Sequence, residues 1–354
     1  MGSRLQVRLQ VGDHVALAGQ PHTAAPLSIG IIGCGRVVEQ HYAPALRSIP
    51  GVRIAALADV REERREVVGQ LLAVGSRFDS ADAMLEEVRP DAVIVATTPG
   101  THADLVTAAL QAGASVLVEK PLATSPADAF TVLSAAASAG RCAMVGFNRR
   151  FWVPVIRLRE MIAGAGSIED VRAHMVMRTD LLNWHAVSGV PDVLDDLGCH
   201  QLDLIRYLFQ SEIVSIRSVW LDSSSVRMEM RLEDGPEVTC IASHSAPSVE
   251  TISIEAAGIR YRATRGSDRI RPAMEPWRQI LDKKDLVVRK LTRRPSTMRD
   301  TFRRQVQAFV DSIRTGNPPV PGIGDGVAAV KAVAAARRSC EANGREIHIE
   351  EISD

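Results

Sequence analysis

Apolar residues in the first 150 positions form short continuous runs separated by amphipathic stretches. Continuous runs bounded by glycine or proline predict strands buried on both faces, as in a parallel sheet. The predicted strands are residues 27–32, 53–58, 91–96, 116–118 and 142–146. The stretches between them predict helices, one of which begins at the candidate capping residue Ser80 and another at Ser125-Pro126, where a first turn tolerates proline. This alternation predicts an α/β fold with a doubly wound parallel sheet.

The pattern changes after Arg150. A predicted helix over residues 153–163 is followed by strand-like runs, several of them separated by turn signals. These runs are residues 168–178, 214–221, 226–232, 237–243 and 251–256. Short turns between consecutive strands indicate antiparallel pairing. Residues 301–314 and 325–342 predict amphipathic helices that pack back on the first domain.

The amino-acid composition argues against several classes of binding partner. Lysine plus arginine and aspartate plus glutamate both total 42, so the balanced charge predicts no nucleic-acid or membrane surface. No apolar run approaches the roughly 20 residues of a membrane span. The five cysteines are scattered and lack metal-ligand spacing, so we predict no metal site. Reduced thiols in turn predict a cytoplasmic protein.

A glycine turn follows the first predicted strand. Gly33 permits a tight turn, and Gly35 lets backbone approach a pyrophosphate, which the following helix N-terminus would hold. That helix begins with Arg36 and Val37. The third position of the pattern, where glycine or alanine allows close packing, is Val38, so the motif departs from the dinucleotide-binding form.

The second predicted strand ends at Asp59. This is about the distance from the glycine turn at which an acidic side chain meets a ribose 2′-hydroxyl; a helix cap is the alternative role. Arg61 and Arg64 follow closely and are candidates for a 2′-phosphate contact. The sequence therefore favours NAD and leaves NADP open.

Charged and polar residues gather where two later strands end. Glu119 and Lys120 stand at the C-terminal end of a buried strand, the edge where ligands bind in open α/β sheets, and Pro121 follows directly. A solvated ion pair is the plainer interpretation of these two charges. Thr97, Thr98, Pro99 and His102 follow the preceding strand at the same edge. His102 is expected either at the nicotinamide or on the surface in a first helical turn.

In the second half, candidate chemistry concentrates on residues 195–203. Asp196 and His200 are four apart and so share one face of a helix, with Asp203 three residues beyond His200. A carboxylate beside an imidazole raises its pKa and orients the ring, as a proton-transferring base requires. The alternative is a structural histidine with a capping aspartate.

These motifs together resemble the glucose-fructose oxidoreductase / inositol dehydrogenase (Gfo/Idh/MocA) family over residues 27–350. The resemblance rests on Gly30-Ile31-Ile32-Gly33-Cys34-Gly35, on Ala96-Thr97-Thr98-Pro99 with His102, on Glu119-Lys120-Pro121, and on Gly146-Phe147-Asn148-Arg149-Arg150-Phe151. It implies a Rossmann domain followed by an α/β domain with a large open, mostly antiparallel sheet. It also implies a nicotinamide cofactor and a sugar or cyclitol substrate.

The resemblance extends to individual residues of the second half. Asp196 and His200 match the family pattern D-x-x-x-H, and Trp184-His185 resembles a substrate-contacting segment, with a packing tryptophan as the alternative. The family often has glycines after the position of Ser188-Gly189, whereas this chain has Val190-Pro191-Asp192. That departure leaves the substrate open.

The predicted organisation has four parts. Residues 1–27 are a leader, for which an edge strand at residues 5–11, disorder and a cloning remnant stay open. Residues 28–150 are the dinucleotide-binding domain and residues 151–322 the substrate and oligomerisation domain. Residues 323–354 are a helix and strand that pack back on the first domain. The basic residues 265–299 are predicted to form a long solvated loop over a sheet edge.

The predicted activity is an NAD(P)-dependent dehydrogenase or ketoreductase acting on a secondary alcohol or ketone of a sugar or cyclitol. Lys120, Asp196 and His200 are the expected catalytic residues. The expected cofactor contacts are Gly33, Gly35, Arg36, Val37, Asp59, Arg64, Thr97, Thr98, Pro99, His102, Glu119, Lys120 and Arg149. The expected substrate contacts are Lys120, Arg150, Trp184, His185, Asp196 and His200.

Two other hypotheses about the function stay open. A non-catalytic NAD-binding sensor on the same fold is one, because fold does not fix function. A dihydrodiol or imine reductase is the other. An open sheet usually needs a covered face, so a homodimer or homotetramer through residues 168–260 is also expected.

Overall fold

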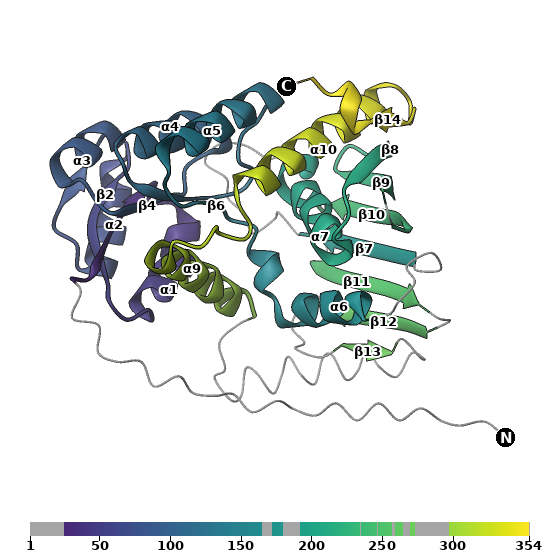
Figure 1. Ribbon diagram of the computed structural model, residues 1–354, viewed down its shortest axis with the longest axis horizontal. Coiled ribbons are helices and arrows are strands. Elements are labelled where there is room, and N and C mark those ends of the chain that lie inside the picture. The colour runs from purple at the N-terminus through teal and green to yellow at the C-terminus, as the bar shows by residue number, and fades with distance from the viewer. Residues whose placement is uncertain are drawn as a thin grey trace.

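The computed structural model describes residues 25–164, 172–179, 192–233, 235–245, 247–256, 259–264, 270–272 and 297–353. The predicted leader, Trp184, His185 and most of the basic segment 265–299 lie outside the described residues. The described chain folds around two sheets that lie side by side, and helices cover both faces of the first sheet and one face of the second (Figure 1).

The first sheet is parallel throughout, with strand order β3-β2-β1-β4-β5-β6. Its strands are β1 (Leu27–Ile32), β2 (Val52–Ala58), β3 (Arg77–Phe78), β4 (Ala92–Val95), β5 (Ser115–Val118) and β6 (Ala143–Val145). The inner strands β4 and β5 are buried at every position, which explains their continuous apolar sequence. The predicted doubly wound parallel sheet is confirmed.

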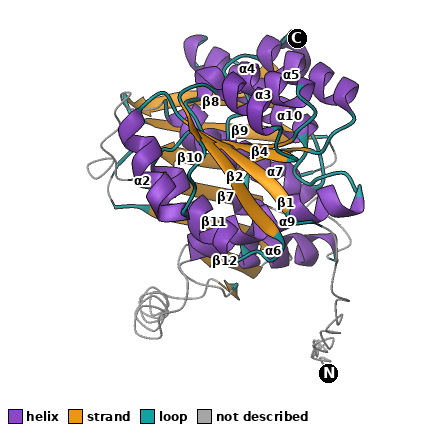
Figure 2. Cartoon of the chain, turned by 90° about the vertical axis from the view of Figure 1, so that its left-hand side faces the viewer, coloured by secondary structure: helices purple, strands orange, loops and turns teal. Residues whose placement is uncertain are grey.

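Helices cover both faces of this sheet (Figure 2). One face packs α3 (Ala81–Val88), α4 (His102–Gln111) and α5 (Pro126–Ala139), and the other packs α1 (Ala43–Arg47) and α2 (Glu62–Leu72). Ser80 and Ser125 cap α3 and α5 by accepting hydrogen bonds from the backbone N–H groups of Ala83 and Asp128, and the cap at Ser80 was predicted. The expected helix after the glycine turn opens with a π-helical segment, η1 (Val38–Tyr42), before α1.

The second sheet has eight strands in the order β13-β12-β11-β7-β10-β9-β8-β14. They are β7 (Arg172–Arg178), β8 (Ile213–Asp222), β9 (Ser225–Leu232), β10 (Glu237–Ser243), β11 (Val249–Ala256), β12 (Ile259–Thr264), β13 (Arg271–Pro272) and β14 (Ile347–His348). The sheet is mostly antiparallel, as expected, but β10 and β7 pair in parallel. Strands β12 and β13 were not predicted, and β13 falls inside the segment expected to be a loop. β14 is the strand that was predicted within residues 323–354.

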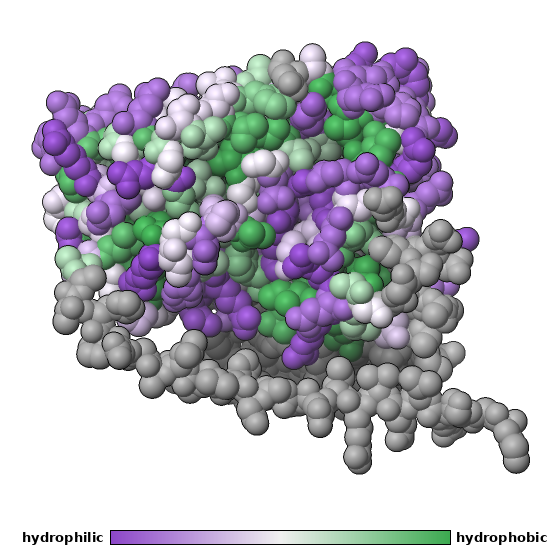
Figure 3. Space-filling model, in the orientation of Figure 1, coloured by the Kyte–Doolittle hydropathy of each residue, from purple (hydrophilic) through white to green (hydrophobic). Residues whose placement is uncertain are grey.

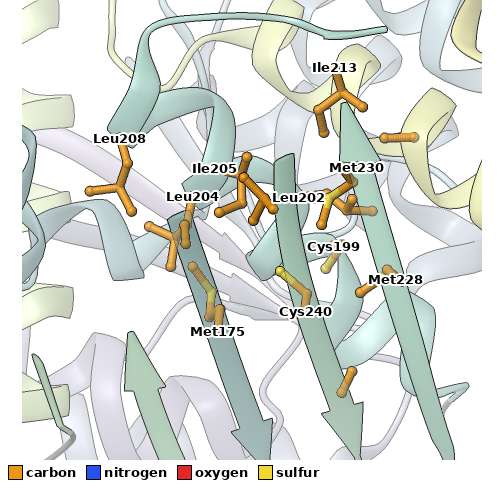
Figure 4. Packing of buried hydrophobic residues seen from close by; sticks show 14 of the residues in the cluster. Met175, Cys199, Leu202, Leu204, Ile205, Leu208, Ile213, Met228, Met230 and Cys240 are labelled. Carbon is orange, nitrogen blue, oxygen red and sulfur yellow. The ribbon is translucent and has the colours of Figure 1, made fainter. Parts of the chain in front are cut away.

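One face of the second sheet packs against helices that include α6 (Val153–Ala163) and α7 (Cys199–Phe209). Figure 4 shows Leu202, Leu204 and Ile205 of α7 beside strand residues such as Met175 and Cys240. Because these side chains belong to one buried cluster, α7 is held rigidly over the sheet. The π-helical segment η5 (Leu194–Gly198) leads directly into α7 and carries Asp196.

Two C-terminal helices join the halves. α9 (Thr297–Thr315) buries Phe302, Phe309 and neighbouring residues on the first sheet's side, as expected for residues 301–314. α10 (Ile323–Glu341) packs on α5 near its start and on α7 and β8 further along. The expectation that residues 323–354 pack on the first domain is therefore only half right. β14 pairs with β8 in the second sheet, because Ile347 completes that sheet's core.

The remaining short elements are η2 (Pro99–Thr101), η3 (Asn148–Phe151) and η6 (Ile349–Glu351). On the face shown in Figure 3, apolar residues gather in separate patches between polar ones. Among the residues that the structure describes, no helix combines the length and apolarity needed to cross a bilayer.

Candidate functional site

The glycine turn leaves open space beside the first sheet. Gly33 has φ +94°, and a Cβ there would lie 2.5 Å from the Ala96 carbonyl oxygen, so only glycine fits the turn. A Cβ on Gly35 would meet nothing within 4 Å. The helix begins immediately afterwards, at Arg36. Free space at Gly35 before a helix N-terminus is the arrangement that receives a phosphate group.

Asp59 fastens this turn to the end of β2. Its Oδ2 accepts a hydrogen bond from the Cys34 backbone N–H at 2.7 Å, and its Oδ1 accepts one from the Arg61 N–H at 2.9 Å. Arg64 donates to the Cys34 carbonyl oxygen at 2.8 Å and to the Glu39 carboxylate at 2.7 Å. Arg64 is thus engaged in holding the turn, which weakens its candidacy for a 2′-phosphate.

Lys120 and Asp196 come from the two halves of the molecule and meet between them. Lys120 Nζ donates to Asp196 Oδ1 at 2.7 Å and to the Asp196 main-chain oxygen at 2.9 Å. Burial lowers the pKa of Lys120, but the Asp196 carboxylate outweighs it and the pKa ends above its ordinary value. Burial raises the pKa of Asp196, yet Lys120 holds it below its usual range. Both groups are therefore charged at neutral pH.

His200 lies one turn beyond Asp196 and is 2% exposed. Arg149 Nη1 lies 3.1 Å from His200 Nε2. A guanidinium can only donate, so Nε2 is the acceptor and the neutral ring carries its proton on Nδ1. Nδ1 is buried and has no hydrogen-bond partner among the described residues.

The pKa of His200 moves opposite to the sequence prediction. Burial lowers this pKa, and the nearby cations Arg149 and Lys120 lower it further, to well below its ordinary value. Asp196 acts in the predicted direction but is outweighed. The prediction was wrong because it considered one carboxylate and neither burial nor the two cations. His200 is accordingly neutral at physiological pH.

His102 and Glu119 support the Lys120 loop from below the surface. His102 is fully buried, and its Nδ1 lies 2.7 Å from the Pro121 carbonyl oxygen, so it is not the exposed residue that one alternative expected. Glu119 accepts a hydrogen bond from the Tyr42 hydroxyl at 2.7 Å and one from the Lys120 N–H at 3.2 Å. The Lys120–Pro121 peptide bond is cis.

The burial and the ion pairs of Arg150 contradict its predicted role as a substrate contact. It is 5% exposed, and its guanidinium makes a bidentate contact with the Asp203 carboxylate and a 2.9 Å contact with Asp325. Burial lowers the pKa of Arg150, but the two carboxylates raise it above its ordinary value. Because these pairs occupy the guanidinium, Arg150 joins α7 to α10. Asp203 therefore belongs to this pair and not to His200.

Two residues of the site whose side chains are buried were missed in the sequence. His244, directly after β10, lies with Nε2 3.2 Å from Asp196 Oδ2. Glu250 in β11 accepts a hydrogen bond from Arg149 Nη2 at 2.8 Å. A weak signal for Glu250 existed, since it stands on the same strand face as the core residues Ile252 and Ile254. Nothing in the local sequence marked His244.

A cavity of about 440 Å³ borders the residues that follow Lys120. It is lined by Pro121, Leu122, Phe147, Cys199 and residues of α10 such as Val330. None of Lys120, Asp196 or His200 lines it. The cavity is therefore not the space in which those three groups act together.

The N-terminal residues match a known family. Residues 27–147 match the model described as "Oxidoreductase family, NAD-binding Rossmann fold" (GFO_IDH_MocA). These residues match the NAD-binding part of the Gfo/Idh/MocA oxidoreductase family. The chain is an oxidoreductase with an NAD-binding Rossmann domain, and the resemblance drawn from the motifs is confirmed.

Relatives align over most of the chain. Inositol 2-dehydrogenase 3 of Saccharopolyspora erythraea is 28% identical over 310 residues, which cover 85% of this chain and 89% of that protein. Myo-inositol 2-dehydrogenase of Thermotoga maritima is 27% identical over 342 residues, covering 92% and 99%. The structure of scyllo-inositol dehydrogenase from Lactobacillus casei with NAD(H) and scyllo-inositol superposes with a TM-score of 0.73 at 20% identity, covering 92% and 99%, and supports the fold.

The residues present fit a dinucleotide. The open space at Gly35 and the adjoining helix N-terminus suit a pyrophosphate. The Asp59 carboxylate stands at the end of β2 against the glycine turn, where a ribose hydroxyl would be held. Thr97 and Pro99 border the same edge after β4, ahead of Lys120 after β5. These strand ends form one continuous border from the turn to Lys120.

Proposed function

We propose that this protein is an NAD-dependent dehydrogenase or ketoreductase that acts on a secondary alcohol or ketone of a cyclitol or sugar. The observation that carries the proposal is the meeting of Lys120, Asp196 and His200 at the border just described. Lys120 and Asp196 are 76 residues apart in the chain, yet their side chains are 2.7 Å apart. The full-length alignments with inositol dehydrogenases support the substrate class.

The cofactor would supply hydride transfer, and the residues would hold the substrate and move one proton. Two of the three N–H groups of Lys120 point at Asp196, and the third, which has no partner among the described residues, would donate to the substrate oxygen. The positive charge of Lys120 would stabilise negative charge developing on that oxygen. Asp196 keeps Lys120 protonated and in place.

His200 would accept the hydroxyl proton in oxidation and return it in reduction. The low pKa keeps the ring neutral, so Nε2 has a lone pair for the proton, while burial and the two cations make the ring a weaker base than a free imidazole. Arg149 occupies Nε2 in this structure, so proton transfer requires Arg149 to give up that contact while it keeps its ion pair with Glu250. This requirement makes Arg149 part of the substrate side of the site.

The cofactor contacts are proposed from the same geometry. Gly33, Gly35, Arg36 and Val37 would face the pyrophosphate, and Asp59 the ribose. Residues from the ends of β4 and β5 would border the nicotinamide, namely Thr97, Thr98, Pro99, Glu119 and Lys120. Arg64 and His102 would act indirectly, by holding the glycine turn and the Pro121 carbonyl.

The test begins with binding. Thermal shift and tryptophan fluorescence with NAD(H) and NADP(H) should show a clear preference for NAD(H), after which myo-inositol, scyllo-inositol and neutral aldoses are assayed by NADH absorbance. Turnover of at least one of these compounds is expected. Binding of NAD(H) without turnover of any of them would favour the non-catalytic sensor.

We also propose an oligomeric state and a cellular location for this protein. Among the described residues, the helices that pack on the second sheet lie on one face, so we infer that the other face pairs with a second copy in a homodimer or homotetramer. Light scattering coupled to size exclusion would test this. All five cysteines are free thiols, which supports a cytoplasmic location.

A further inference from the structure

Glu250 forms a second buried ion pair beside the first. Arg149 donates from Nη2 to Glu250 Oε1 at 2.8 Å, and the two side chains are 14% and 6% exposed. Through Nη1 the same guanidinium reaches His200. Arg149 thus stands between the proposed proton acceptor and a carboxylate that neutralises it.

The charges around His200 balance. Among the described residues, four charged side chains contact one another or His200: two cations, Lys120 and Arg149, and two anions, Asp196 and Glu250. Each cation has its own carboxylate within 2.8 Å. His200 itself is neutral, so these four described side chains place two positive and two negative charges around it.

A balanced site treats neutral and anionic substrates differently. A buried carboxylate loses its hydration and needs an uncompensated cation in return, whereas hydroxyl groups need only hydrogen-bond partners. Arg149 without Glu250 would be such a cation, because a guanidinium pairs well with a carboxylate. In this protein, Glu250 holds the position beside Arg149 that a substrate carboxylate would otherwise take.

We propose that Glu250 is a specificity-determining residue, which neutralises Arg149 and so restricts the site to uncharged polyhydroxylated substrates while disfavouring the corresponding sugar acids. This inference rests on the proposed function and narrows its substrate class. Glu250 acts through Arg149 and need not touch the substrate itself.

Matched substrates and variants test the proposal. D-glucose with D-glucuronate and D-galactose with D-galacturonate differ only in a hydroxymethyl or carboxylate group. Each is assayed as a substrate and as a competitive inhibitor of myo-inositol oxidation, with wild type, Glu250→Gln, the charge-conserving control Glu250→Asp, and Arg149→Gln. NAD(H) binding and thermal unfolding check that each variant is folded.

Wild type should prefer the neutral member of each pair by at least about tenfold in kcat/KM or in Ki. Glu250→Gln should move that ratio at least about tenfold towards the acid, through KM or Ki more than through kcat, and Glu250→Asp should keep the wild-type ratio. Arg149→Gln should move it the other way. A tenfold change corresponds to about 1.4 kcal/mol.

The outcomes separate the two proposals. A folded Glu250→Gln variant with an unchanged ratio overturns the role of Glu250 and leaves the proposed function intact. If Glu250→Gln does not fold, Arg149→Gln decides, and an unchanged ratio there has the same meaning. A wild-type protein that turns over no neutral polyol or sugar overturns the proposed function and, with it, this inference.

Discussion

Arg149 and Arg150 are neighbours in the chain, but their side chains enter two different charge clusters. Arg149 joins the site cluster, which we define as Lys120, Asp196, His200, Arg149 and Glu250. Arg150 joins the junction cluster, defined as Arg150, Asp203, Arg206 and Asp325. The short segment η3 turns the two side chains in different directions.

The two clusters differ in what their charges are bonded to. In the junction cluster, Arg150 contacts two carboxylates, and Arg206 shares Asp325 with it. These bonds connect η3, α7 and α10, so the cluster holds elements together. In the site cluster, one N–H of Lys120 has no partner among the described residues, and Arg149 contacts a neutral imidazole. Arg150, whose hydrogen-bond partners are carboxylates alone, therefore has a structural role. Arg149 also contacts a neutral imidazole and is therefore available for chemistry.

The largest expected effect is on stability and belongs to the junction cluster. Arg150→Met should lower the free energy of unfolding by about 3–5 kcal/mol, because it leaves Asp203 buried without its partner. Urea denaturation followed by circular dichroism measures this. The double variant Arg150→Met/Asp203→Leu should recover much of the loss, since no carboxylate is then left alone at that position. Equal loss in both variants would contradict the ion-pair explanation.

The site cluster should show a different profile, in which the loss of activity is the main effect. Lys120→Met and His200→Ala should reduce kcat by at least about a hundredfold, because each removes a group that holds or moves the transferred proton. NAD(H) affinity, measured by fluorescence titration, should stay within a few fold of wild type. Wild-type turnover in either variant would remove that residue from the mechanism.

The clusters should also respond to acid with opposite sign. The pKa of His200 is lowered in the folded state, so the unfolded chain binds its proton first and stability falls as pH drops below about 6.5. Burial raises the pKa of Asp203 to about 6 against the opposing effect of Arg150. The folded state then binds that proton first, and stability rises as pH falls from about 6 towards 4.

Single variants separate these two contributions. Relative to wild type, His200→Leu should lose less stability between pH 7 and pH 5, and Asp203→Asn should lose more. Each difference is limited to about 1.4 kcal/mol per pH unit for one proton. Urea denaturation at a series of pH values gives both curves. Identical pH dependence in all three proteins would show that neither group titrates differently on folding.

The smallest effect concerns His244, which contacts the site cluster without entering it. His244→Ala should lower kcat about tenfold, because the Asp196 carboxylate loses one of the hydrogen bonds that orient it towards Lys120. KM and NAD(H) affinity should change little. His244→Gln restores a donor and should recover most of the rate. A change confined to thermal stability in both variants would make His244 a packing residue only.

The local pattern of apolar residues was sufficient to predict most strands of the first sheet. Strands buried on both faces have continuous apolar sequences, so β1, β2, β4, β5 and β6 were predicted to within two residues at each end. Gly33 and Glu119-Lys120-Pro121 were recognisable for a similar reason, because a tight turn and a strand end impose their residues locally. The Asp196–His200 spacing likewise follows from helical geometry alone.

Only the tertiary structure decided which charges pair. Arg149 meets Glu250 across 101 positions of the chain, and Arg150 meets Asp325 across 175. The sequence shows that these residues are charged, but their roles depend on which partner lies within hydrogen-bonding distance and on how much water remains. The lowered pKa of His200 is a sum over burial, Arg149, Lys120 and Asp196, of which the sequence placed only Asp196 nearby. Such sums depend on distances in space, and spacing along the chain does not contain them.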